Sequence, residues 1–162
     1  MSTDEGNYHA LPQTRGRNAH QKIDEKKTTT QTDVIESLAV ISHEMGIYGK
    51  IDIYKKSTKS LIERKYNLKN IFRGQIYQLW GQYFCMTEMG YDVKSIAFYE
   101  ISTHKTTDIN IPDERDKNEF LNFLTSFRNY NPKSNFSQNQ KKCAHCIYCN
   151  LCDKTNQDNV YT

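Results

Sequence analysis

The stretch Ile47-Tyr48-Gly49-Lys50-Ile51-Asp52-Ile53-Tyr54, followed after a polar turn by Leu61-Ile62-Glu63-Arg64-Lys65-Tyr66, decides the fold. Apolar and polar side chains alternate along residues 47–54, which is the pattern of a half-buried β-strand. Residues 61–66 favour a further strand, and the polar turn between them predicts an antiparallel hairpin. If the turn centres on Ser57 and Thr58, the numbers of facing residues add to 115. Asp52 is then predicted to face Glu63 across the hairpin.

The remaining core alternates between predicted strands and helices. Short apolar runs predict strands at residues 38–41, 93–101 and 107–111. Helical spacing predicts a helix from residue 71 to Gly90 and a second one beginning at Pro112. The positions that carry this spacing are Phe72, Ile76, Leu79, Trp80 and Tyr83 in the first helix, and Phe120, Leu121, Leu124 and Phe127 in the second. The order of elements predicts an α/β fold with a mixed sheet flanked by helices.

Composition divides the 162 residues into three parts. Residues 1–33 form a polar N-terminal arm, residues 34–128 the core, and residues 129–162 a polar linker with a cysteine-rich tail. Hydrophobic residues make up 36% of the chain, so part of it is predicted to lie outside a packed core. Five basic and two acidic residues follow from Arg128 onward, which accounts for the net charge of +3. This balance excludes a histone-like polycation and an acidic-tail protein.

The sequence shows no stretch typical of membrane insertion. No run approaches the ~18 consecutive apolar residues of a membrane span, and no apolar segment of a signal peptide follows Met1. We therefore expect a soluble, cytoplasmic protein without a membrane partner.

The predicted pairing of Asp52 with Glu63 makes the hairpin a candidate metal-binding site. Directly opposite residues have Cβ atoms about 4.5–5.5 Å apart, where two carboxylates repel unless a cation lies between them. Lys65 lies two residues after Glu63 and therefore shares its face. This arrangement suits a divalent metal with a lysine that orients water or stabilises negative charge. The alternative is a solvated ladder of surface charges.

Basic residues dominate the segment around this pair. Between Lys55 and Arg73 there are seven basic residues and one acidic residue, Glu63. A positive segment with interleaved aromatic residues is typical of nucleic-acid binding, and single-stranded bases stack on such aromatics. The predicted DNA contacts are Lys55, Lys59 and Arg73, with Tyr54, Tyr66 and Tyr77 as stacking residues. The alternative is that the lysines of the turn form a solubilising face.

Several short motifs occur in the order seen in RecB-like nucleases. They are Gly16-Arg17-Asn18-Ala19-His20, Gly49-Lys50-Ile51-Asp52, Glu63-Arg64-Lys65 and Gln78-Leu79-Trp80-Gly81-Gln82-Tyr83, followed by a terminal cysteine cluster. From residue 8 to residue 153 the chain resembles the CRISPR-associated exonuclease of spacer acquisition. The resemblance implies a RecB-like core, of the restriction-endonuclease type, within the predicted α/β fold.

The resemblance also implies roles for individual residues. His20, Asp52 and Glu63 match the side chains that hold Mg²⁺ or Mn²⁺ in the family, and the backbone carbonyl of Arg64 would be a further ligand. Lys65 matches the catalytic lysine. Gln78 matches the glutamine of the helix motif, whose commoner form has tyrosine four residues later. Here Gln82 stands at that position, and its role stays open.

Two functions follow as expectations. The resemblance implies a metal-dependent DNA exonuclease that trims DNA fragments, called prespacers, for integration into a CRISPR array. Its implied partners are DNA, the CRISPR adaptation integrase and the small structural partner of that integrase. The alternative is a nuclease-inactive DNA-binding or regulatory module with a structural metal–thiolate site.

The cysteine cluster has a uniform spacing. Its members are Cys143, Cys146, Cys149 and Cys152. Closely repeated cysteines favour an iron–sulfur cluster, whereas zinc, the alternative, is more often held by two pairs separated by a longer loop. The resembled family carries a four-iron four-sulfur cluster whose three C-terminal ligands match Cys143, Cys146 and Cys152, with a fourth upstream. No cysteine precedes Cys85, which is predicted to be a buried free thiol, so either Cys149 is the fourth ligand or the start of the chain is truncated.

Overall fold

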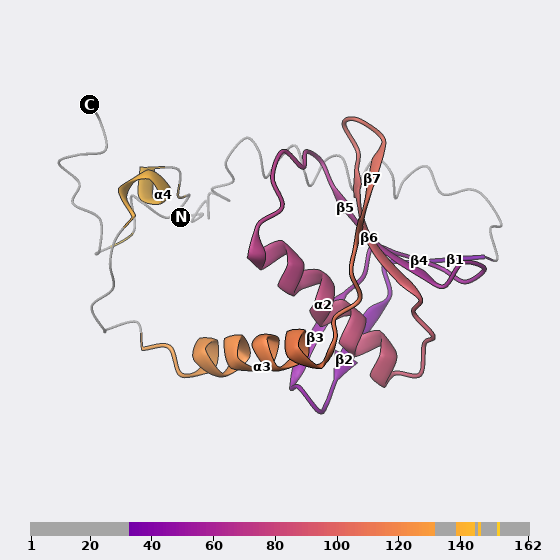
Figure 1. Ribbon diagram of the computed structural model, residues 1–162, viewed down its shortest axis with the longest axis horizontal. Helices are drawn as coiled ribbons and strands as arrows, with labels where there is room; N and C mark the ends of the chain where they lie inside the picture. Colours follow the sequence, from indigo (N-terminus) through magenta and orange to yellow (C-terminus); the bar gives the residue numbers. More distant parts are fainter. Residues whose placement is uncertain (1–32, 132–138, 145, 147–151, 153–162) are drawn as a thin grey trace, which may run out of the picture.

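A computed structural model describes residues 33–131, 139–144, 146 and 152 (Figure 1). Five strands form one sheet in the order β1-β4-β5-β6-β7, in which β5 and β6 are parallel and the other neighbours antiparallel. They are β1 (Val34–Glu36), β4 (Ile53–Lys55), β5 (Ser60–Lys65), β6 (Ser95–Glu100) and β7 (Lys105–Ile109). A second sheet pairs β2 (Ala39–Ser42) with β3 (Ile47–Lys50). The helices are α2 (Arg73–Glu88), α3 (Glu114–Arg128) and the short α4 (Gln140–Ala144). The predicted α/β fold with a mixed sheet is confirmed.

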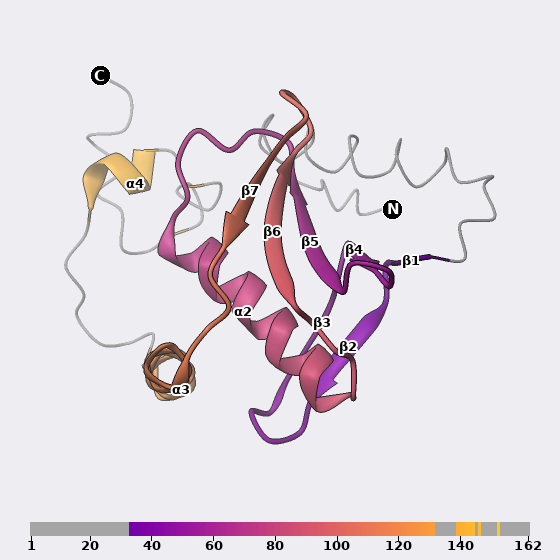
Figure 2. The ribbon, with the colours of Figure 1, turned by 45° about the vertical axis from the view of Figure 1, so that its right-hand side comes forward.

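The strand predicted over residues 47–54 is wrong as a single element, because it divides between the two sheets. Ile51 and Asp52 lie between β3 and β4 at a bend in the chain. The facing strand bends at Ser37, whose φ of 58° lies in the left-handed region. Hydrogen bonds from Ser37 N to Asp52 O (3.1 Å) and from Ile51 N to Leu38 O (3.0 Å) continue the pairing through the bend. The β2–β3 pair thus leaves the main sheet and packs toward α2 (Figure 2). Asp52 lies in the bend between β3 and β4.

The β4–β5 hairpin has the predicted register. Ile53 faces Ile62, Tyr54 faces Leu61 and Lys55 faces Ser60, so each pair of numbers adds to 115. The edge strand β1, which was not predicted, pairs with β4 on the other side. The central strand β5 is thus covered on both edges, by β4 and by β6.

The long helix α2 packs on the sheets and forms most of the core. Leu79 and Met86 of α2 are fully buried with Leu61 of β5 and Phe98 of β6. The helix ends where predicted, since Gly90 has a φ of +88° that favours glycine.

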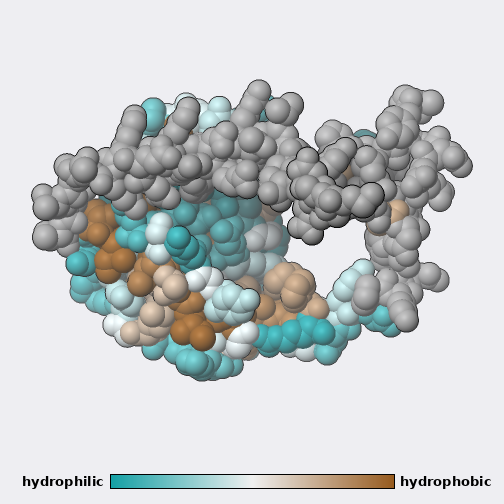
Figure 3. All heavy atoms as spheres, turned by 180° about the vertical axis from the view of Figure 1, so that it is seen from behind, coloured by the Kyte–Doolittle hydropathy of each residue, from teal (hydrophilic) through white to brown (hydrophobic). Residues whose placement is uncertain are grey.

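The second long helix, α3, is amphipathic but only partly buried. Asp113 caps its first turn by accepting a hydrogen bond from Asp116 N (2.9 Å). Phe120 and Leu124 are buried, whereas Phe127, predicted to belong to the same stripe, is 72% exposed. Apolar side chains accordingly gather on the surface along this helix (Figure 3).

Three sequence predictions fall on residues that the structure does not describe. They concern the N-terminal arm, of which only Asp33 is described, with its motif residue His20, and Cys149 of the tail. Among the described residues, no helix combines the length and apolar character needed to cross a membrane.

Candidate active site

Glu63 lies at the centre of a network of hydrogen-bond donors. It is on the central strand β5 and only 5% exposed. Its Oε1 accepts from Lys65 Nζ (2.9 Å) and Gln78 Nε2 (2.7 Å), and its Oε2 accepts from Gln82 Nε2 (2.8 Å). Lys65 Nζ also donates to Gln78 Oε1 (2.8 Å). Because three donors from two elements hold it, the carboxylate has one fixed orientation.

Asp52 joins this network through the neighbouring backbone. Its Oδ2 accepts a hydrogen bond from Arg64 N at 2.8 Å, across the hairpin. Asp52 is half-buried, and the bend before β4 turns its side chain toward β5. The sequence prediction that Asp52 and Glu63 come together is supported by this bond and by the register of the hairpin. The alternative of a solvated surface ladder is wrong, since Glu63 is buried.

The helix motif supplies both glutamines from one face of α2. Gln78 and Gln82 are four residues apart, so they lie one above the other on the helix surface. Gln82 Nε2 donates to Lys50 O (3.2 Å) as well as to Glu63, and both partners are acceptors, so the orientation of the amide is set. Its Oε1 is buried and has no hydrogen-bond partner among the described residues. The position whose role the sequence left open therefore supports the same carboxylate as Gln78.

The donor set of this site fits a hard divalent cation. Mg²⁺ prefers oxygen ligands and is often held by one or two carboxylates with several waters. Asp52, Glu63 and the backbone carbonyl of Arg64 are oxygen donors of this kind, while His20 lies outside the described residues. Within the described ranges, no three His, Cys, Asp or Glu side chains come together as a metal-binding group.

The three predicted DNA contacts differ in their bonding partners. Lys55 is exposed at the end of β4. Lys59 donates to Asp92 Oδ2 at 2.5 Å, and this bond raises the pKa of Lys59 and lowers that of Asp92. Arg73 forms an ion pair with Glu119 of α3, and its guanidinium carbon lies 5.0 Å from the ring centroid of Trp80. Arg73 therefore joins α2 to α3.

The three predicted stacking tyrosines have different environments. Tyr54 is 5% exposed and donates its hydroxyl to Asp92 O (2.8 Å), so the prediction that it stacks on bases is wrong. Tyr66 is exposed. Tyr77 is half-buried, donates to Glu119 Oε1 (2.6 Å) and has its ring centroid 4.5 Å from that of Phe123.

The described cysteines are all free thiols. Cys143 lies in α4, and Cys146 N donates to Cys143 O (3.0 Å), which places the two residues on one turn. Cys152 is half-buried. Cys85 on α2 is 2% exposed, as predicted, and burial raises its pKa to about 11, which keeps the thiol protonated and unreactive.

Comparison with known proteins supports the fold. No family profile matches the sequence, and no curated protein matches it. Among solved structures, the chain is similar to the crystal structure of SSO0001, with a TM-score of 0.54 and 14% sequence identity. The similarity covers 89% of this chain and 71% of that one. At this identity the similarity concerns the arrangement of strands and helices alone.

Proposed function

We propose that this protein is a metal-dependent DNA nuclease with a RecB-like core. The observation that carries the proposal is the buried carboxylate of Glu63, which accepts hydrogen bonds from Lys65, Gln78 and Gln82. Asp52 accepts a hydrogen bond from the backbone N–H of Arg64, the residue that follows Glu63 on β5. A lysine, two carboxylates and an amide network around one strand match the residue types that phosphodiester hydrolysis requires.

Each side chain has a distinct part in the proposed reaction. Bound Mg²⁺ or Mn²⁺ would polarise the scissile phosphate and lower the pKa of an attacking water. Asp52, Glu63 and the carbonyl of Arg64 would hold the ion, with His20 as a further ligand. Lys65 Nζ, fixed between Glu63 and Gln78, would donate to a phosphate oxygen or orient the water. Gln78 and Gln82 keep the carboxylate of Glu63 in place.

The proposed biological role is that of an exonuclease that trims DNA fragments before a CRISPR adaptation integrase inserts them. This role rests on the motif order and on the cysteine tail. Cys143, Cys146, Cys152 and Cys149 would hold a four-iron four-sulfur cluster, with zinc as the alternative metal. Anaerobically purified protein should then be brown, contain equal iron and sulfide, and bleach in Cys143→Ala; a colourless protein with one zinc per chain would contradict the cluster.

One observation favours a second function, a nuclease-inactive DNA-binding or regulatory module. Glu63 Oε1 already accepts two hydrogen bonds, one of them from a lysine. A buried ion pair of this kind can be structural alone. The two functions differ in whether Asp52 and Glu63 are needed for DNA cleavage.

Cleavage of end-labelled DNA separates them. The full chain is incubated with single- and double-stranded DNA in Mg²⁺, in Mn²⁺ and in chelator. We expect cleavage that needs the metal and disappears in Asp52→Asn, while Asp108→Asn, an exposed aspartate of β7, behaves as wild type. Equal digestion by Asp52→Asn would contradict the assignment. Co-purification with the integrase in the presence of a DNA fragment tests the partner, and its absence would favour a free-standing nuclease.

A further inference from the structure

We propose that the groove between α2, α3 and β3 is a nucleobase-binding subsite for the unpaired base beside the cleaved phosphate. The proposal rests on the nuclease function and adds where the substrate strand lies. The groove has a volume of about 380 Å³, at the small end of the range for ligand pockets. One nucleoside is the right size of ligand for it, whereas a base in a duplex must first be unpaired and unstacked.

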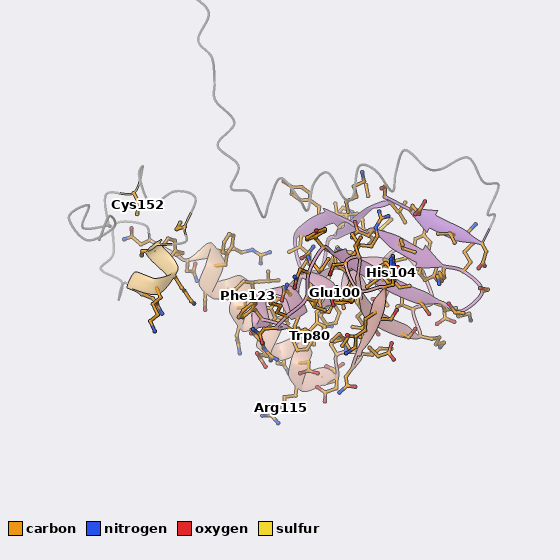
Figure 4. All side chains as sticks on the ribbon, turned by 90° about the horizontal axis from the view of Figure 1, so that it is seen from above. Trp80, Glu100, His104, Arg115, Phe123 and Cys152 are labelled. Atoms are coloured by element: carbon orange, nitrogen blue, oxygen red, sulfur yellow. The ribbon has the colours of Figure 1, made fainter. Side chains whose placement is uncertain are left out.

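The wall formed by the helices is aromatic. Tyr77 of α2 and Phe120 and Phe123 of α3 line the groove, and the ring centroid of Phe123 lies 4.5 Å from that of Tyr77. Phe123 is 40% exposed and lies beside α2 in the view with side chains (Figure 4). Partly exposed aromatic rings are the surfaces on which unpaired bases stack, with little dependence on base identity.

The wall formed by β3 leaves space for a base because a glycine stands there. Gly49 shares a face of its strand with Ile47, whose Cδ1 would lie 3.6 Å from a Cβ built at Gly81 of α2. A Cβ at Gly49 itself would meet no atom within 4 Å. The groove is therefore open at this point, and any larger side chain at Gly49 would extend into it.

The groove is continuous with the proposed active site. Gln78 and Gln82 line it, and both donate to Glu63. A base bound here would place its phosphate next to the carboxylates.

Binding in chelator tests the groove without cleavage. The probe is single-stranded DNA with 2-aminopurine as the terminal base, titrated with the full chain. We expect its fluorescence to be quenched on binding and the affinity to exceed that for a blunt duplex of the same length. Gly49→Leu and Phe123→Ala should each weaken binding by about 5- to 150-fold, the loss of one stacked base. The matched control is Phe127→Ala, on the same helix but outside the groove lining.

The outcomes distinguish this inference from the nuclease proposal. If Gly49→Leu and Phe123→Ala bind the probe with wild-type affinity and quenching while Glu63→Gln abolishes cleavage, the groove proposal is overturned and the nuclease proposal stands. Equal affinity for the blunt duplex also overturns it. If Gly49→Leu and Phe123→Ala both lose binding while the wild-type protein cleaves no DNA with either Mg²⁺ or Mn²⁺, the groove proposal stands and the nuclease proposal fails. Gly49→Ala and Gly49→Val give a graded series should the leucine variant misfold.

Discussion

The two ends of the β4–β5 hairpin carry similar residues in different environments. At one end, Glu63 is 5% exposed and bonded to Lys65 and to two glutamines. At the turn, Lys59 pairs with Asp92, with both side chains about half exposed. Each end has a lysine bonded to a carboxylate, yet only the first is enclosed. Local charge is therefore similar at the two ends, and it is the packing of α2 that encloses only one of them.

The helix creates the difference by covering one end only. Gln78 and Gln82 reach Glu63 from α2, and Gln82 also bonds to Lys50 O. The turn at residues 56–59 has instead Asp33, whose carboxylate accepts from Ser57 N (2.7 Å) and Ser57 Oγ (2.6 Å). Exposed pairs are screened by water and salt, whereas a buried network is both stronger and more costly to break. Substitutions at the two ends should therefore differ greatly in effect.

The largest effect is expected for Glu63→Ala. It removes a proposed metal ligand and leaves the amides of Gln78 and Gln82 and the ammonium of Lys65 without their acceptor. Cleavage should fall by at least about 10³-fold, since a bound metal supplies several kcal/mol of stabilisation to the transition state. The melting temperature should fall as well. Cleavage of end-labelled DNA and thermal unfolding measure both, with Asp92→Asn as the control from the turn. Comparable losses in Asp92→Asn would end the distinction between the two ends.

Lys65→Ala should have the next largest effect, on cleavage alone. The ammonium contacts Glu63 and Gln78 but is no metal ligand, so affinity for Mn²⁺ should stay near that of the wild type. Loss of a positioned proton donor typically costs about 10²–10⁴-fold in rate. Calorimetric titration with Mn²⁺ and the cleavage rate give the two readouts. Lys59→Ala, at the other end of the hairpin, should cleave normally; a Lys65→Ala protein that cleaves at the wild-type rate would leave the ion pair with a structural role only.

Gln82 should have an intermediate effect, because it acts on Glu63 from α2. Gln82→Leu removes the donor to Glu63 Oε2, and loss of such a supporting bond typically costs about 10–100-fold in metal affinity or activity. Gln82→Glu keeps the shape but adds a like charge, which raises the pKa of the carboxylate pair and shifts the pH profile of cleavage upward. The measurement is the pH–rate profile of each variant. An unshifted profile in Gln82→Glu would contradict the direct contact.

The sequence predicted the hairpin well because the cause is local. The alternation, the polar turn and the strand period determine which residues face each other, and the facing pairs follow the predicted register. The helix motif could be placed for the same reason, since the spacing of Gln78 and Gln82 puts both on one face. That both amides reach Glu63 depends on how α2 docks on the sheet, which involves contacts between distant residues.

The errors share a physical reason. The bend at Ile51 and Asp52 has no glycine or proline, so the period of two runs through it without a signal. It is the facing residue, Ser37, that takes the left-handed conformation. The sequence predicts base stacking for Tyr54 because this residue adjoins the basic segment, but β1 and the packing around Asp92 bury it. Burial by distant elements cannot be read from the period of one strand.

The pH dependence of stability should report whether water reaches the buried thiol of Cys85 on α2. Burial raises the pKa of its thiol from 9.0 to about 11, so the folded protein holds this proton more tightly than the unfolded chain. The stability that this pKa shift contributes is fully present below the pKa of the thiol in the unfolded chain. It is lost as the pH rises through the pKa of the thiol in the folded protein. Between about pH 8 and about pH 10.5, the melting temperature of the wild type should therefore fall further than that of Cys85→Ala. Equal losses in the two proteins would show that water reaches this thiol.

The smallest effect is expected at the turn, from Lys59→Ala or Asp92→Asn. The hydrogen bond from Lys59 lowers the pKa of Asp92, and a second one from Lys94 acts in the same direction. Any stability from this group is present above the unfolded pKa of the aspartate and is lost as pH falls through the lowered folded value. Because the pair is exposed, each variant should unfold close to the wild type near neutral pH, and added salt should remove the remaining difference. Melting curves at low and high salt measure this. A large decrease in the melting temperature of Asp92→Asn that salt does not change would show that the Lys59–Asp92 pair contributes as much stability as the network around Glu63.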